Sequence, residues 1–197
     1  VFVSVLDHIR TNTAGSADLQ LLNTRYGTDL EESESDMYIT LATRRDTVNF
    51  INEKKLAELP GESAILKGEI KGEFPENSLP TLMELELKPG AQIIFIKNDP
   101  DKRWVNGTIG TVSGIDENDT LYVITEDGQE FDVKKERWAN IRYRYNEEEK
   151  RIEEEERGVF IQYPVRLAWA ITIHKSQGLT FTRVVIDFTG GVFAGGQ

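Results

Sequence analysis

The chain of 197 residues contains no cysteine and only two histidines, His8 and His174. Without cysteine it can form neither a disulfide framework nor a thiolate metal site. The two histidines lie far apart in the sequence without ligand spacing around them, so we expect no metal site. Long apolar runs are also missing, since none approaches the roughly 18 residues of a membrane span, and the N-terminus has no signal-peptide pattern. We therefore expect a cytoplasmic protein that does not enter a membrane.

Positive charge is in short supply, because 23 Lys and Arg stand against 34 Asp and Glu, a net charge of -11. Phosphate binding needs clustered basic residues, so this balance argues against a protein that coats DNA. It leaves room for a protein that touches a single strand with a few residues in one groove. With 39% hydrophobic and 29% charged residues, the composition is that of a globular protein, and 197 residues are enough for one α/β domain with an insertion or for two small domains.

The most informative stretch is Ala170–Gly178, which reads AITIHKSQG. A β-prone apolar run from Val165 to Ile173 stops there at four polar residues, His174–Gln177, and a glycine follows at once. This pattern predicts a buried strand that delivers polar side chains to the edge of a sheet. Ligands bind at the carboxyl ends of strands in open α/β sheets. The next apolar run, Val184–Phe188, predicts another central strand.

A second strand followed by a polar turn lies near the start of the chain. The run Met37–Ala42 predicts a short buried strand, and Thr43 with Asp46 predicts a helix start resembling a capping box. The helix should end at Pro60-Gly61. Its apolar stripe consists of Val48, Ile51, Leu56 and Leu59. A strand, a polar turn and an amphipathic helix form half of the unit from which parallel sheets are built.

Between these two parts the sequence pattern changes to short strands and turns. Four or five short strands separated by Asn-Gly and Glu-Asp-Gly turns follow within residues 91–133, which predicts a small antiparallel barrel of the SH3-like kind. Residues 141–145 and 160–163 alternate as strands do. The segment between them, residues 146–157, holds seven glutamates. An exposed β-ribbon with a charged tip fits the flanking alternation better than a helix does.

Three segments resemble superfamily 1 DNA helicases of the RecD-like, PIF-type branch. AITIHKSQGLTF resembles motif V of that family, and YITLATRRDTVNFIN resembles motif IV. LKPGAQIIFIKND followed by WVNGTIGTV resembles a barrel that the family inserts into its second motor lobe. The resemblance implies an α/β fold with a partial RecA-like parallel-sheet lobe, residues 36–86 and 164–197. An SH3-like barrel with its ribbon, residues 87–163, would be inserted in this lobe, after a helical lead-in of residues 1–35.

The same resemblance implies part of an ATP-dependent DNA helicase whose cofactors are ATP and Mg²⁺. Its partners would be single-stranded DNA and the N-terminal motor lobe of the same chain. The sequence has no GxxxxGK[ST] phosphate loop and ends before an arginine-bearing motif VI. It also begins without methionine. We therefore expect a monomeric fragment of a longer protein that cannot hydrolyse ATP alone and holds no catalytic residue.

Residue roles are carried over position by position from the two motifs. The ATP cleft would be lined by Thr43, Arg44, Gln177 and Gly178. Single-stranded DNA would be bound by Thr172, His174, Lys175 and Ser176. A loop of the barrel adds a basic and aromatic group, Lys102, Arg103 and Trp104, as further DNA-binding candidates. For this group the alternative is a core tryptophan in a solvated loop, and for Thr43 and Arg44 it is a capping threonine with a surface arginine.

Two other functions fit the sequence. One is a non-enzymatic SH3-like module on an α/β scaffold that binds a protein or peptide. The other is a nuclease or repair factor that carries a degenerate motor lobe. A phosphate loop encoded upstream would favour the helicase over both.

Overall fold

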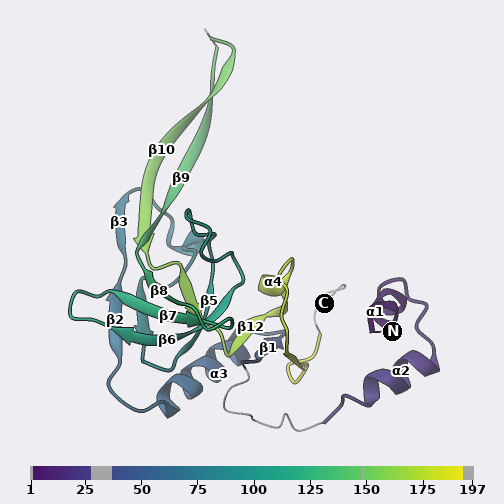
Figure 1. Cartoon of the computed structure of the whole chain (residues 1–197). Helices are drawn as coiled ribbons and strands as arrows, with labels where there is room; N and C mark the ends of the chain where they lie inside the picture. The colour runs from purple at the N-terminus through teal and green to yellow at the C-terminus, as the bar shows by residue number, and fades with distance from the viewer. Residues whose placement is uncertain (1, 28–36, 148, 193–197) are drawn as a thin grey trace. The chain divides into compact units, whose positions relative to one another are not determined.

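The computed structural model describes residues 2–27, 37–147 and 149–192, which fall into two compact units (Figure 1). The expected lead-in and lobe therefore extend, at residues 1, 28–36 and 193–197, beyond the described part. The first unit contains α1 (Phe2–Arg10) and α2 (Ser16–Asn23). Gly15 is the N-cap of α2, and its N–H donates to Asp18 at 2.9 Å. The Asp18 carboxylate also meets the His8 ring at 3.1 Å, which ties the two helices together.

The second unit contains a parallel sheet of three strands in the order β12-β1-β13. Its strands are β1 (Ile39–Ala42), β12 (Ala170–Thr172) and β13 (Val184–Asp187). Ala42 pairs with Thr172 on one side and with Asp187 on the other, so all three strands end level. The prediction of β1 is confirmed. The prediction that residues 184–188 form a central strand is wrong for the described sheet, because β1 takes the centre.

Helix α3 (Arg45–Glu58) follows β1 and buries Val48, Asn52 and Leu56. Asn52 forms two hydrogen bonds with the backbone of β12, because its Nδ2 donates to the Ala170 carbonyl and its Oδ1 accepts the Ala170 N–H, both at 2.9 Å. The expected capping box is not formed. Arg44 is the N-cap without a side-chain capping bond, since Thr43 is buried at the end of β1.

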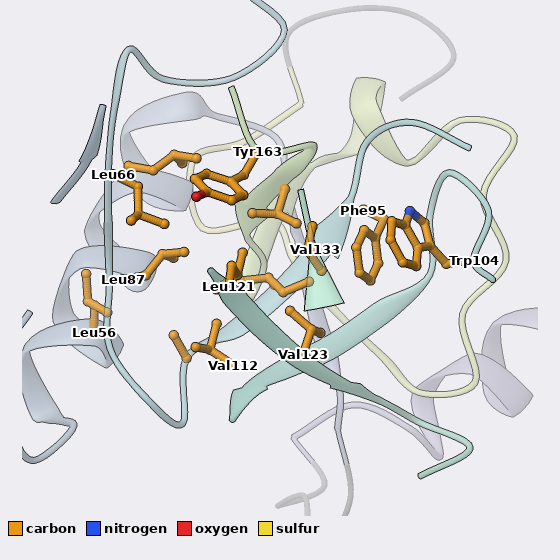
Figure 2. Close-up of a cluster of buried hydrophobic side chains, with 14 residues drawn as sticks. Leu56, Leu66, Leu87, Phe95, Trp104, Val112, Leu121, Val123, Val133 and Tyr163 are labelled. Carbon is orange, nitrogen blue, oxygen red and sulfur yellow. The ribbon is translucent and has the colours of Figure 1, made fainter. Parts of the chain in front are cut away.

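A five-stranded antiparallel sheet has the order β11-β5-β6-β7-β8. Its strands are β5 (Gln92–Phe95), β6 (Ile109–Ile115), β7 (Leu121–Thr125), β8 (Glu130–Val133) and β11 (Val165–Leu167). Figure 2 shows its core, in which Trp104 stacks on Phe95 at 4.3 Å between ring centroids. Within the described residues the sheet is open and β8 does not return to β11, so a closed barrel is not observed. A two-stranded sheet, β2 (Ala64–Lys67) and β4 (Glu84–Leu87), adds Leu66, Leu85 and Leu87 to this core instead.

The single strand predicted from residue 165 to 173 is divided between the two sheets. Its first part is β11, antiparallel to β5, and its second part is β12, parallel to β1. Gln92 lies at the junction, where its Nε2 donates to the carbonyls of Ala168 at 2.7 Å and Tyr38 at 2.8 Å. This buried amide joins the parallel sheet to the antiparallel one.

The predicted ribbon is confirmed as β9 (Glu136–Asn146) paired with β10 (Arg151–Gln162). Strand β3 (Glu69–Gly72) pairs with the base of β10, and the short helix η1 (Glu76–Ser78) follows it. Beyond this base the two strands project from the rest of the unit (Figure 1). No helix in the described ranges is long and apolar enough to cross a membrane.

Candidate functional site

The candidate site lies at the carboxyl edge of the parallel sheet. Strand β1 leads there into Thr43 and Arg44, and β12 leads into the short helix α4 (Ile173–Ser176), which lies against β1. The sheet thus places all eight motif residues on two neighbouring segments at one edge. These residues are Thr43, Arg44, Thr172, His174, Lys175, Ser176, Gln177 and Gly178.

The turn after β12, residues 172–178, is held by its own backbone and by the core. The Ser176 hydroxyl donates to the Ile173 carbonyl at 2.7 Å, and the Leu179 N–H donates to the Ser176 carbonyl at 3.0 Å. Gly178 has φ of +81°, a left-handed conformation that other residues rarely adopt. Leu179 then packs on the core around Ile39. The turn therefore presents the exposed residues His174, Lys175 and Gln177 from a fixed backbone.

Three cationic side chains from three segments interact electrostatically at this edge, and we call Arg45, Arg166 and Lys175 the basic cluster. Lys175 is an exposed residue, yet desolvation of its ammonium group, together with the charges of Arg166 and Arg45, lowers its pKa to about 8. Burial lowers the pKa of Arg166, and the charge of Arg45 adds to the effect. Neighbouring cations of this kind favour an anion between them.

Two buried polar atoms near the site lack a hydrogen-bond partner in the described part of the chain, the hydroxyl of Thr43 and Nε of Arg166. Arg166 still donates through one terminal nitrogen to the Pro80 carbonyl. The sequence contained a signal for Arg166, because it is a charged residue in an otherwise apolar strand run. Arg45 was missed beside Arg44 in the Thr-Arg-Arg-Asp segment, although it is the first residue of α3.

Arg44 has a partner within the chain. Its Nε donates to the carbonyl of Gly190 at 2.7 Å. A Cβ placed on Gly190 would lie only 2.5 Å from Cδ of Arg44, so the arginine packs directly across this glycine. Arg44 therefore ties the end of β1 to the segment that follows β13.

The three candidates on the loop after β5 have separate environments. Arg103 donates to both carboxylate oxygens of Asp99, at 2.9 and 2.8 Å, and this hydrogen bonding lowers the pKa of Asp99. Trp104 is 5% exposed, with Phe95 stacked on its ring and the Arg103 guanidinium 4.5 Å from its centroid. Both of its faces are covered, which matches the core alternative and leaves no open face for a base. Lys102 remains exposed.

Among the residues that the structure describes, no group of three or more His, Cys, Asp or Glu side chains can hold a metal ion. The donor set is cationic and hydroxylic, so it fits phosphate oxygens and does not fit Mg²⁺.

The fold and this edge together define a mixed α/β protein, with a small parallel sheet, several antiparallel sheets and an anion-suited site at the strand ends. No protein-family model matches the chain. It is 31% identical to ATP-dependent DNA helicase Pif1 from Bdellovibrio bacteriovorus over 96% of this chain and 41% of that protein. It is also 31% identical to PIF1 from Xenopus laevis over 100% of this chain and 30% of that protein.

Solved structures give the same result. Bacteroides sp Pif1 in complex with ADP-AlF4 superposes with a TM-score of 0.83 at 35% identity, over 94% of this chain and 42% of that one. Bacteroides Pif1 bound to ssDNA superposes with a TM-score of 0.73 at 34% identity, over 98% and 43%. The chain is therefore similar, over nearly all of its length, to a portion of Pif1 DNA helicases. It spans less than half the length of these relatives.

Proposed function

We propose that the chain is part of a Pif1-type, ATP-dependent DNA helicase and supplies the second motor lobe, which grips single-stranded DNA and completes the ATP cleft. The similarity of almost the whole chain to a segment of helicases that bind ssDNA and a nucleotide analogue supports this proposal. The observation that carries it is the shared edge, where the motif residues lie beside a cationic cluster. In finer terms, the lobe is RecA-like, and residues 87–163 are its SH3-like insertion with the ribbon.

In this proposal the turn after β12 holds the phosphates of the DNA strand. Lys175 and His174 supply cationic or imidazole N–H donors, and the Thr172 hydroxyl supplies a neutral one. Ser176 uses its hydrogen within the turn and orders the backbone that carries its neighbours. Arg45 and Arg166 raise the local positive potential and help to retain the strand.

Gln177 and Gly178 form the side of the turn that faces the nucleotide. The Gln177 amide hydrogen-bonds near the terminal phosphate, and Gly178 lets the backbone approach closely because it has no side chain. The unpartnered Thr43 hydroxyl is a further donor, while Arg44 braces the edge through Gly190. When bound, ATP and Mg²⁺ would supply the phosphoryl chemistry, and Gln177, Gly178 and Thr43 would hold the nucleotide on this side of the cleft. One turn that contacts both ligands couples them.

The decisive experiment uses the longer helicase to which the chain would belong. Gln177→Ala is expected to reduce ATP hydrolysis and unwinding about tenfold or more while ssDNA affinity is retained, because only the cleft loses a donor. Lys175→Ala is expected to weaken ssDNA binding. Gln129→Ala, an exposed glutamine on the turn between β7 and β8, is the matched control. Unchanged hydrolysis and unwinding in Gln177→Ala would contradict the assignment.

A further inference from the structure

The distal half of the ribbon carries a surface that the proposed helicase site does not use. Four large side chains there are exposed, Ile141 at 40%, Tyr143 at 64%, Tyr145 at 58% and Ile152 at 68%. In the β9–β10 register Tyr145 lies opposite Ile152, and side chains alternate between faces along a strand. The four therefore share one face of the ribbon, and we call them the apolar ribbon face.

The opposite face of β9 carries Arg142 and Arg144, both exposed and without an ion pair in the described part of the chain. The glutamates across from them are already engaged. Glu155 pairs with Arg157 at 3.1 Å, and Glu153 accepts from Asn146 at 2.9 Å. The positive charge of the two arginines is thus open to a partner on the free side of β9.

Among the described strands β9 lies at the edge of its sheet, as the order β3-β10-β9 shows. A hollow of about 500 Å³ lies along it, lined by residues of β9 and of the segment after β3. Its lining includes Phe74, Pro80, Trp138, Ile141 and Tyr143. Since Ile141 and Tyr143 belong to both surfaces, the hollow continues the apolar ribbon face toward the base.

Hydrogen bonds within the chain hold the base of the ribbon in place, so no partner protein is needed to order it. Arg157 donates to both carboxylate oxygens of Glu73, at 3.1 and 2.9 Å, and the Asn140 amide donates to the Glu73 carbonyl at 2.8 Å. A long, preformed strand with an open edge is a template for another strand. Such an edge provides backbone hydrogen bonds, and the alternating side chains select the sequence.

We propose that β9 is a docking strand for an extended segment of a partner protein that adds to its open edge. The segment carries apolar side chains at alternate positions, which cover Tyr143 and Tyr145 and enter the hollow. Its intervening positions are acidic and meet Arg142 and Arg144. A nucleic acid fits less well, because bases stacked on Tyr143 and Tyr145 would bring phosphates beside Glu154 and Glu156, whereas the acidic positions of the segment lie on the opposite face with the arginines.

The test uses the 197-residue chain and a fluorescent peptide of about seven residues in which valine and glutamate alternate. The expected result is that the anisotropy of the peptide rises as the chain is added. The affinity should fall about tenfold or more in Arg142→Glu/Arg144→Glu. That variant should instead bind a peptide in which valine and lysine alternate. Tyr143→Ser/Tyr145→Ser should also lose binding. Lys54→Glu and Tyr26→Ser, both exposed positions outside the ribbon, should bind as the parent does.

Four results would overturn the proposal. One is equal binding of a peptide with the same composition whose valines and glutamates stand in separate blocks. Another is full binding of a peptide whose alternate backbone amides are methylated, since strand addition needs those N–H groups. The third is oligothymidine that binds the chain and loses affinity in the same ribbon variants, which would make the face a nucleic-acid surface. The fourth is absence of binding by the alternating peptide. Circular dichroism verifies that each variant is folded.

Discussion

Lys175 combines an accessible position with a pKa of about 8, and the cause is desolvation followed by the charges of Arg166 and Arg45. Below this pKa the ammonium is charged and attracts phosphate, and above it the attraction is lost. We therefore predict that the affinity of the chain for oligothymidine falls as pH rises through about 8. Lys175→Arg should bind with little change over the same range, because an arginine stays charged. Anisotropy titrations at constant ionic strength measure both.

An equal loss of affinity in Lys175→Arg would show that another group carries the pH dependence. Lys54→Arg is the control, since Lys54 is exposed on α3 and pairs with Glu58 at 3.8 Å.

Asn52 provides a prediction about stability. Its buried side chain is the partner of both backbone groups of Ala170. Asn52→Leu fills similar space but leaves a buried N–H and a buried carbonyl unpaired, so we expect a loss of about 2–4 kcal/mol in the free energy of unfolding. Urea denaturation measures it, with Asn49→Leu at an exposed position of the same helix as the control. Equal effects of the two variants would mean that the amide contacts contribute little.

At the scale of elements, the contact between β3 and β10 depends on the absence of side chains. A Cβ on Gly158 would lie 2.5 to 2.7 Å from the backbone of Glu73. Gly158→Ala is therefore expected to push β3 away from the ribbon base and to destabilise the fold by about 1–3 kcal/mol. Gly114→Ala is the control, because an added Cβ there meets nothing within 4 Å. A Gly158→Ala variant as stable as Gly114→Ala would be inconsistent with so close an approach.

Elements whose pattern is local were predictable from the sequence. Strand β1, helix α3 and the β9–β10 ribbon follow from alternation, an apolar stripe and the turn residues around them. The division of residues 165–173 into β11 and β12 was not predictable. It depends on pairing with β5 and β1 and on the buried amide of Gln92, which is distant in the sequence. The prediction of a closed barrel was wrong for a similar reason. Leu66, Leu85 and Leu87, which belong to another sheet, fill the core instead.

Part of the candidate site was also predictable from the sequence, and part was not. The turn after β12 could be located because a polar cluster after an apolar run predicts a strand end. Arg45 and Arg166 could not be placed beside Lys175, since only the folded arrangement of α3, β11 and α4 brings their charges together. The burial of Trp104 likewise depends on Phe95 and Arg103, which pack against its ring.

For the whole molecule, the net charge of -11 opposes binding to a polyanion, whereas the basic cluster favours it. Three cations that each displace counterions from a single strand give a slope of about -2 for log affinity against log salt concentration. We predict this slope, and weak affinity, for oligothymidine bound to the isolated chain. Arg45→Ala/Lys175→Ala should reduce the magnitude of this slope to about 1 or less. Lys54→Ala should leave the slope unchanged. Tight binding with a steeper slope that survives the double variant would place the contact elsewhere, because the cluster contains too few charges to produce it.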